Sequence, residues 1–322
     1  TFGNPIITKR ADGTWVVAFA SGYNNVNGGD GNGHLLVLNA NTGAKLLNIS
    51  TGVDAGLAKI NAWVDSETDN TAKRFYGGDM LGNVWRFDID NLVKPYGQAF
   101  KLAQLTAVGG VAQPITTAPA LAEVNYLGAK YAVVYVGTGR YMGMSDLGTT
   151  GKQSIYAFKD ALSETGLGDL RTGNTLVAQT LTTNGRIRTA TKNPLDWSSK
   201  NGWLVDLPTS GERVNVGMVL AFNVLSVAST VPSATACEIG GTSWLYKLDI
   251  ANGAAVSNAP ENAAGVMLEE GKLIVGQTVV QLTDGSVTTV STQSDGSTRS
   301  DPQPPPPSTA VLRRTSWREI AN

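Results

Sequence analysis

The sequence is poor in the residues that most catalytic and metal centres need. Its 322 residues include a single cysteine, Cys237, and a single histidine, His34. One cysteine excludes an internal disulfide framework and a cysteine-rich zinc site, and it leaves open whether Cys237 is buried, free or paired outside this chain. Catalysis by a Ser/His/Asp or Cys/His group would have to run through His34, which we interpret as a polar side chain at a strand end.

Charge and long apolar runs are also scarce. Charged residues make up 16% of the chain, the net charge is −1, and no block of five or six like charges occurs. We therefore expect no nucleic-acid partner. The longest apolar candidate, residues 217–229, is shorter than the roughly 18 residues that a membrane span requires. We predict a buried strand there and no membrane span.

Glycine, in contrast, is abundant, with 37 residues, and many Thr, Ser and Asn residues accompany it. This composition is typical of a turn-rich β protein. An apolar strand, a short turn and a second strand with a polar end recur along the chain. The second strands end at Asn39, Asp88, Lys159, Asp206 and Asp249, with spacings of 49, 71, 47 and 43 residues. The longest spacing contains an insertion at 142–152, and a period in the forties indicates propeller blades.

The predicted fold is therefore an all-β propeller of three- to four-stranded antiparallel blades. We expect five or six blades in this chain, in a modified and incomplete ring, because one blade needs neighbours to bury both faces of its sheet. The marker strands fall at 35–39, 83–88, 154–159 and 243–249.

The first blade is the clearest example of the repeat. It contains four apolar segments with turns at 11–13 and 41–43, and the segment 15–20 carries apolar side chains on both faces. That pattern predicts a sheet covered on both sides. One short helix is expected at 159–169.

The carboxy-terminal part changes in character. Residues 1–291 form the predicted propeller, and residues 292–309, rich in Ser, Asp and Pro, form a predicted linker. Residues 310–322 include Trp317 and other apolar residues, so we predict a tail that docks on the propeller or completes a blade.

Most other conspicuous residues fit a structural role. We interpret four tryptophans on repeat strands as core packing: Trp15, Trp85, Trp203 and Trp244. Asp88 and Asp249 end their strands and are expected to cap turns. Residues 137–140 are interpreted as a blade turn rather than a phosphate loop. The segment 24–33 is interpreted as a hairpin tip, although it offers oxygen ligands from Asn25, Asn27, Asp30 and Asn32.

The segment "VDSETDNTAK" at 64–73 is the main candidate site. Asp65, Glu67 and Asp69 occupy the first, third and fifth places of a calcium loop, and Asn70 occupies the place of its glycine. The predicted ligands are these three carboxylates and the carbonyl of Thr71. Lys73, however, stands at the ninth place, where another carboxylate is expected.

Three interpretations of this loop remain open. Lys73 can act as a counter-ion, so that calcium is absent or binds weakly, at about 10⁻⁴–10⁻³ M. Calcium can bind while Lys73 turns to solvent, or the loop can be a plain polar hairpin. We favour the counter-ion, because an ammonium competes with a metal for the same oxygens.

Three segments carry a family resemblance: residues 65–91, 237–253 and "RRTSWRE" at 313–319. They resemble the PilC/PilY-type proteins, secreted factors associated with type IV pili. The resemblance implies a modified propeller that forms the carboxy-terminal domain of a longer protein with an upstream amino-terminal domain. It also implies roles in pilus assembly, in opposing retraction and in adhesion, and a calcium-binding loop at 65–73.

The resemblance also implies partners and a location. Minor pilins or pilus-tip components, host or abiotic surfaces and the upstream domain are the expected partners. The expected location is extracellular or at the cell surface, at the pilus tip or the outer membrane, and we expect no enzymatic activity. Two alternatives are a quinoprotein-like propeller dehydrogenase and a general propeller scaffold for protein partners.

Overall fold

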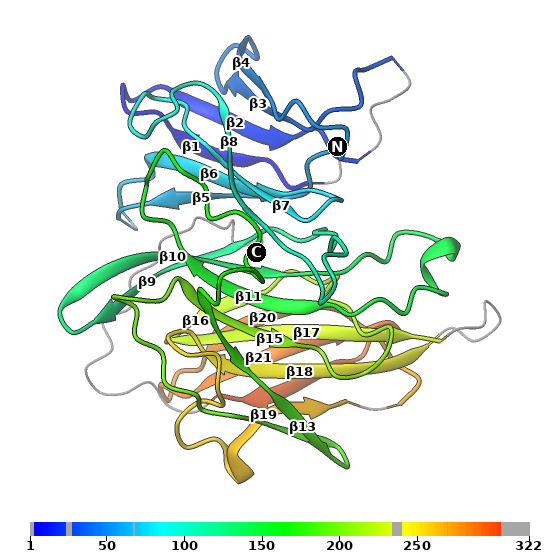
Figure 1. Cartoon of the computed structure of the whole chain (residues 1–322). Helices are drawn as coiled ribbons and strands as arrows, with labels where there is room; N and C mark the ends of the chain where they lie inside the picture. The colour runs from blue at the N-terminus through cyan, green and yellow to red at the C-terminus, as the bar shows by residue number, and fades with distance from the viewer. Residues whose placement is uncertain (1–2, 24–27, 67, 234–239, 269, 304–322) are drawn as a thin grey trace. The chain divides into compact units, whose positions relative to one another are not determined.

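Regular structure in this protein is almost entirely β-strand. The computed structural model describes residues 3–23, 28–66, 68–233, 240–268 and 270–303. Within these ranges the strands form five sheets (Figure 1), and the helical segments are two 3-10 turns, η1 (Met144–Asp146) and η2 (Pro260–Asn262). Neither helical segment of the described residues has the length and apolar character of a membrane-spanning helix. The predicted all-β class is confirmed.

The chain divides into two compact units, and each is described by itself. Among the described residues, the first unit holds 3–134 and 159–173, and the second holds 135–158 and 174–303. Residues 159–173 belong to the first unit although residues 135–158, which precede them in the sequence, belong to the second.

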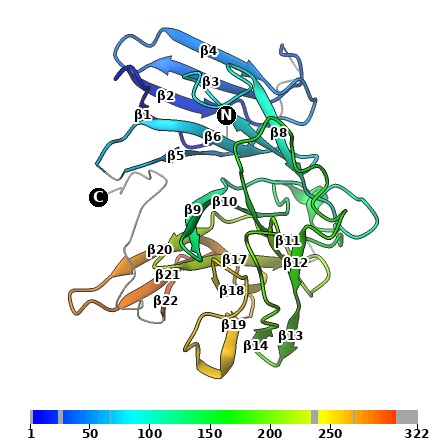
Figure 2. The same cartoon turned by 60° about the vertical axis from the view of Figure 1, so that its left-hand side comes forward.

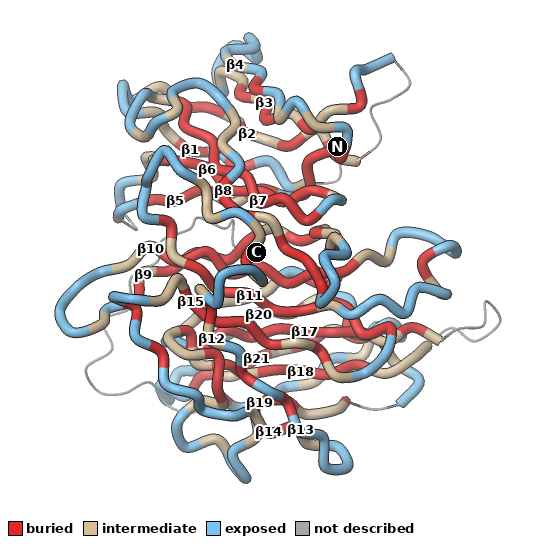
Figure 3. Tube along the Cα trace, viewed as in Figure 1, coloured by how far each residue is buried: buried red, intermediate tan, exposed pale blue. Residues whose placement is uncertain are grey.

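The first sheet contains the four strands predicted for the first blade, in the order β1-β2-β3-β4. These strands are β1 (Ile6–Lys9), β2 (Trp15–Ala20), β3 (His34–Asn39) and β4 (Lys45–Ser50). Gly13 and Gly43 adopt left-handed conformations in the two predicted turns, with φ of 86° and 72°. Only one face of this sheet is buried, because the residues of β2 alternate between buried and partly exposed (Figure 3). The expectation of a sheet covered on both sides is wrong for the described residues.

The second sheet differs in being buried on both faces. Its order is β5-β6-β7-β8, and its strands are β5 (Ile60–Val64), β6 (Ala72–Gly78), β7 (Asn83–Phe87) and β8 (Ala99–Gln104). All five residues of β7 are buried. The first and second sheets lie as two layers (Figure 2) and share a core that includes Val16, Val37, Phe75 and Phe87.

The third sheet contains one parallel strand pair. Its order is β12-β15-β11-β10-β9, and β12 pairs with β15 in parallel. Its strands are β9 (Ala120–Tyr126), β10 (Ala129–Gly137), β11 (Ser154–Lys159), β12 (Leu176–Gln179) and β15 (Gly202–Asp206). All of β11 except Lys159 is buried.

The fourth sheet, in the second unit, joins strands far apart in sequence, in the order β13-β14-β19-β18-β17-β16. Its strands are β13 (Leu181–Asn184), β14 (Ile187–Ala190), β16 (Val219–Ala221), β17 (Val224–Pro232), β18 (Gly241–Asp249) and β19 (Ala263–Met267). The fifth sheet contains β20 (Ile274–Gln281), β21 (Val287–Gln293) and β22 (Thr298–Pro302). Gln277 ties it to the fourth sheet, because its amide oxygen accepts a hydrogen bond of 2.9 Å from Ser226.

The marker strands are therefore confirmed, but several details were wrong. Two sheets have five and six strands rather than three or four. Residues 217–229 form a hairpin rather than one strand, with Phe222 and Asn223 in left-handed conformations at its turn. No helix forms at 159–169. The predicted linker also begins too early, since β22 lies within 292–309.

Some predictions lie outside the described residues. These are the position of Cys237, the remainder of the linker from residue 304, and the docking of residues 310–322. They stay predictions.

Candidate functional site

The candidate loop connects β5 to β6, two neighbouring strands of the second sheet. β5 ends at Val64 and β6 begins at Ala72, so Lys73 is the second residue of a strand. The pairing register shifts between Trp63 and Val64, and the Trp63 indole donates a hydrogen bond of 3.1 Å to Asp65 Oδ1. The strand end thus fixes the direction of the first carboxylate in the loop.

The far end of the loop is fastened to β1 of the first sheet. The carbonyl oxygen of Asn70 accepts hydrogen bonds from the Lys9 backbone N–H, at 2.8 Å, and from Thr8 Oγ1, at 2.6 Å. Lys9 and Thr71 also form a parallel bridge. Asn70 stands at the glycine place of the calcium pattern, but it is not among the residues with positive φ. It contributes its carbonyl group instead.

Each aspartate of the described loop lies near a lysine. Lys9 Nζ lies 3.1 Å from Asp69 Oδ1, and Lys73 Nζ lies 3.9 Å from Asp65 Oδ2. Thr71 Oγ1 donates to the same Asp69 oxygen at 2.6 Å. The Thr71 hydroxyl, followed by Lys9, lowers the pKa of the Asp69 carboxyl group from its usual range. Both aspartate side chains remain 57% exposed, so solvent screens these pairs.

The described carboxylates of this loop do not converge on one point. Calcium takes about six to eight oxygen ligands, whereas in the described residues no three Asp, Glu, His or Cys side chains converge in a way that could hold a metal. Asp65 and Asp69 are each directed toward an ammonium group, and Glu67 lies outside the described residues. Lys9 was missed by sequence analysis, since no local pattern connects it to a loop some 60 residues away.

The structure places His34 in a small polar group at one end of β3. Its Nε2 lies 2.9 Å from Asp30 Oδ1, and its Nδ1 lies 2.8 Å from Asn48 Oδ1. Asn32 donates a side-chain hydrogen bond to the other oxygen of Asp30. These contacts tie the hairpin tip to the sheet and agree with the structural role assigned to His34. Asn25 and Asn27 lie outside the described residues.

The structural roles predicted for the other motifs are mostly confirmed. Asp88 accepts hydrogen bonds from the backbone of Asp90 and Val93, and Asp249 accepts one from Ala251, so both cap turns. The turn at 137–140 packs closely, because a Cβ on Gly139 would lie 2.5 Å from that of Arg213.

Among the tryptophans, one does not fit the prediction. Trp85, Trp203 and Trp244 are buried, but Trp15 is 43% exposed and is not a core residue in the described part.

A buried charge network in the first unit was not predicted. Asp160 accepts hydrogen bonds from Arg86, at 2.6 Å, and from the Tyr76 hydroxyl, at 2.7 Å. Arg86 also donates to the carbonyls of Lys94 and Ser163. The Tyr76 hydroxyl accepts from Arg74, and burial is the main cause that raises the pKa of Tyr76.

The second unit contains a network of the same composition. Glu212 accepts hydrogen bonds from Arg188, at 2.8 Å, from the Tyr246 hydroxyl, at 2.6 Å, and from the Ser229 hydroxyl, at 2.5 Å. The Arg188 guanidinium lies 3.6 Å from the centre of the Trp244 ring. Burial again raises the pKa of the tyrosine, Tyr246. Both networks are fully enclosed, which favours a structural role over substrate binding.

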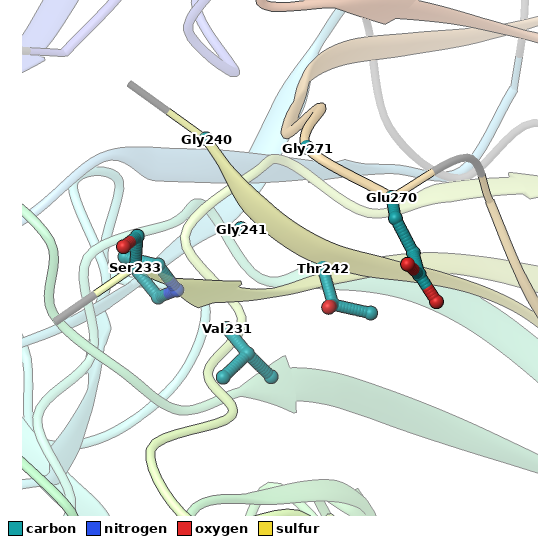
Figure 4. Close-up of a pocket in the computed structure, with 8 residues that line it drawn as sticks. Val231, Ser233, Gly240, Gly241, Thr242, Glu270 and Gly271 are labelled. Carbon is teal, nitrogen blue, oxygen red and sulfur yellow. The ribbon is translucent and has the colours of Figure 1, made fainter. Parts of the chain in front are cut away.

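A surface hollow of about 600 Å³ lies where β17 ends and β18 begins, beside the turn at Glu270–Gly271 (Figure 4). Glu270 is its one ionisable lining residue, and the rest of the lining is small or apolar. The hollow adjoins residues 234–239, which the structure does not describe. We assign no chemistry to it.

Comparison with known proteins agrees with the fold. A family model described as the PilY1 beta-propeller domain matches residues 1–192. A type IV pilus biogenesis factor PilY1 homolog of Xylella fastidiosa is 27% identical over 348 aligned residues, which cover 99% of this chain and 26% of that protein. The type IV pilus biogenesis factor PilY1 of Pseudomonas aeruginosa is 28% identical, over 80% of this chain and 26% of that protein. The chain thus spans about a quarter of the length of these relatives.

Solved structures give the same picture of the fold. The Pseudomonas aeruginosa PilY1 C-terminal domain superposes with a TM-score of 0.76 and 23% identity, covering 94% of this chain and 72% of that one. A quinohemoprotein alcohol dehydrogenase from Comamonas testosteroni reaches a TM-score of 0.32, which is too low to carry an argument. Because the family model spans more than half of the sequence, the chain belongs to the PilY1 β-propeller family.

Proposed function

We propose that this chain is the propeller part of a type IV pilus biogenesis factor and acts without turning over a substrate. It supports pilus assembly, the balance between extension and retraction, and surface adhesion. The observation that carries the proposal is the family match, together with relatives named as pilus biogenesis factors. On this proposal its partners are minor pilins or tip components, surfaces and an upstream domain, and it works outside the cell.

Genetic complementation tests this proposal. A strain that lacks the gene should lose surface pili and twitching motility, and the full gene should restore both. A copy of the gene without the codons for residues 1–303 should fail to restore them while still producing the rest of the polypeptide. Normal piliation and twitching in the deletion strain would contradict the proposed role.

We also propose that lysines hold the 64–73 loop in place of calcium. Two ammonium groups, on Lys9 and Lys73, bring the same two positive charges as one calcium ion. They lie beside the two aspartates that would otherwise act as ligands. The fastening of Asn70 to β1 further supports a loop that keeps its shape without a metal.

Calcium titration of the purified chain tests the lysine proposal independently of pilus biology. The wild type should bind calcium no more tightly than about 10⁻⁴–10⁻³ M, and its melting temperature should not change with a chelator. Lys73→Asp should create or strengthen calcium binding, because it restores a carboxylate at the ninth place. Lys45→Gln removes an exposed lysine elsewhere and is the control. Micromolar binding by the wild type would refute the proposal and leave the pilus assignment untouched.

A further inference from the structure

Two methionines stand at the start of the insertion at 142–152, on the surface of the second unit. Met142 and Met144 are 51% and 66% exposed, whereas the other three methionines of the chain are only partly exposed. Both line a hollow of about 300 Å³, together with Tyr141, Gly143 and Leu147. The wall of this hollow therefore contains two thioether groups.

The backbone between the two methionines directs both side chains to the same side of the chain. Gly143 is extended, with φ of −165° and ψ of 177°. The residues before and after an extended residue share one face, and their Cα atoms lie about 7 Å apart. A methionine side chain is unbranched and has three rotatable bonds, so two sulfur atoms at this spacing can approach the same ion.

Hydrogen bonds to charged side chains hold this part of the insertion in place. Asp146 is 2% exposed and accepts hydrogen bonds from the Met142 backbone N–H, at 2.9 Å, and from Arg140 Nε, at 2.6 Å. Arg213 donates to the backbone carbonyls of Arg140, Asp146 and Thr149. A segment that is already ordered loses little conformational entropy when it binds a ligand.

The donor atoms of the hollow favour a soft metal ion over a hard one. Its lining, which consists of described residues only, has no carboxylate, imidazole or thiol group. Asp146 is the one acidic residue in 140–149, and each of its two carboxylate oxygens already accepts a hydrogen bond. Calcium and magnesium prefer oxygen ligands, carboxylates above all, whereas thioether sulfur selects soft ions such as Cu(I).

We infer that Met142 and Met144 form a binding site for a soft monovalent metal ion, of the class of Cu(I) and Ag(I). The site is distinct from the 64–73 loop, which belongs to the first unit and offers carboxylates. A thioether has no proton for the metal to displace. The affinity should therefore be the same at about pH 5.5 and about pH 7.5, unlike that of a site built from histidine or cysteine.

Calorimetric titration with Ag(I) tests the inference, because this ion has the soft chemistry of Cu(I) and needs no reducing agent. The purified 322-residue chain carries Cys237→Ser throughout, so that its one thiol cannot bind the metal. This parent should bind Ag(I) in chloride-free buffer with excess Mg²⁺ present. Met142→Leu and Met144→Leu should each weaken binding at least about tenfold, since leucine keeps the volume and removes the sulfur. Met218→Leu, at a partly exposed methionine of the same unit, is the control and should bind as the parent does.

The methyl groups of the methionines show where the ion binds. In a chain with isotope-labelled methionine methyl groups, the NMR signals of Met142 and Met144 should shift when Ag(I) is added, and those of the other three methionines should not. The inference would be overturned if the parent bound no Ag(I), or if the two leucine variants bound it as tightly as the parent. Shifts at the other methionines would also overturn it, and so would an affinity that rises with pH, which would assign the ion to His34.

Discussion

Each unit contains a buried ion pair that is hydrogen-bonded to a tyrosine hydroxyl. In the first unit the pair is Asp160–Arg86 with Tyr76, and in the second it is Glu212–Arg188 with Tyr246. All four charged side chains are at most 1% exposed. The two networks differ in what else supports the arginine. Arg86 has two backbone carbonyls as further acceptors, whereas the other acceptors of Arg188 are hydroxyl groups.

This difference decides how much each unit depends on its carboxylate. A buried guanidinium that loses its carboxylate is costly unless other acceptors remain. Arg86 would keep the carbonyls of Lys94 and Ser163, which the backbone holds in place. Arg188 would keep only hydroxyls of Thr183, Thr209 and Tyr246, which are weaker partners for a full charge.

The largest expected effect is that of Glu212→Gln. The substitution leaves Arg188 charged and buried, and it also weakens the acceptor for Tyr246 and Ser229. We expect the free energy of unfolding to fall by about 3–5 kcal/mol, measured by urea denaturation. Glu261→Gln, at an exposed position of the same unit, should have no measurable effect. A loss as small as that of the control would mean that the network is not structurally important.

Asp160→Asn should have a smaller effect in the first unit, about 2–3 kcal/mol. The two carbonyl acceptors and the stacking of Arg86 on Phe100, 4.4 Å from the ring centre, remain in the variant. The same denaturation experiment measures it, with the exposed Asp54→Asn as control. If Asp160→Asn costs more than Glu212→Gln, the explanation through spare acceptors is wrong.

For the tyrosines we expect the opposite order, with the larger loss of stability in the first unit. The Tyr76 hydroxyl connects Arg74 to Asp160, so Tyr76→Phe removes two hydrogen bonds that hold buried charged groups. We expect a loss of about 1–2 kcal/mol, larger than that of Tyr246→Phe. The Tyr246 hydroxyl also connects an arginine to a carboxylate, but that arginine, Arg188, keeps Glu212 and two threonine hydroxyls as acceptors. Tyr96→Phe, at an exposed tyrosine, provides the baseline. Equal losses from the two buried tyrosines would show that the bridge to Arg74 adds nothing.

The smallest effect is expected for the exposed pair Lys9–Asp69, which extends the comparison to the surface. Lys9→Gln should lower the melting temperature far less than either buried variant, and the shift should vanish in about 0.5 M salt. Because the pKa of Asp69 is lowered, its contribution is present above the pKa of an unfolded aspartate, about 3.9. It is lost as the pH falls through the folded pKa. The wild-type and variant curves should therefore converge in acid, and a difference that persists there would contradict the ion pair.

Much of the fold could be predicted because short-range sequence patterns define the strands and turns of the repeat. The four strands of the first blade follow from alternating apolar residues and from glycine turns at Gly13 and Gly43. The hairpin at 219–232 was missed, because its turn consists of Phe222 and Asn223 and interrupts an apolar run without a glycine. β22 was missed for the opposite reason: Asp295-Gly296 is a turn signal, but the polar composition around it suggested a linker.

The helix expected at 159–169 failed because tertiary contacts outweighed local propensity. Asp160 points into the core toward Arg86 and Tyr76, and Leu162 adopts a left-handed conformation that ends any helix. Lys9 was not predicted as the partner of Asp69 for a similar reason, since it reaches the loop only because β1 lies beside it in the fold. Such long-range pairs cannot be seen in a single sequence.

The order of strands in the fourth sheet has a consequence for synthesis on the ribosome. β14 ends at Ala190, yet its partner β19 begins at Ala263, so more than 70 residues must be translated before the two can pair. Until then one edge of the β13–β14 hairpin has no sheet to join, and long-range pairing of this kind is slow and exposed to misassembly. Nascent chains arrested before Met267 should be sensitive to protease in the second unit, whereas every described segment of the first unit is present once Gly173 has emerged.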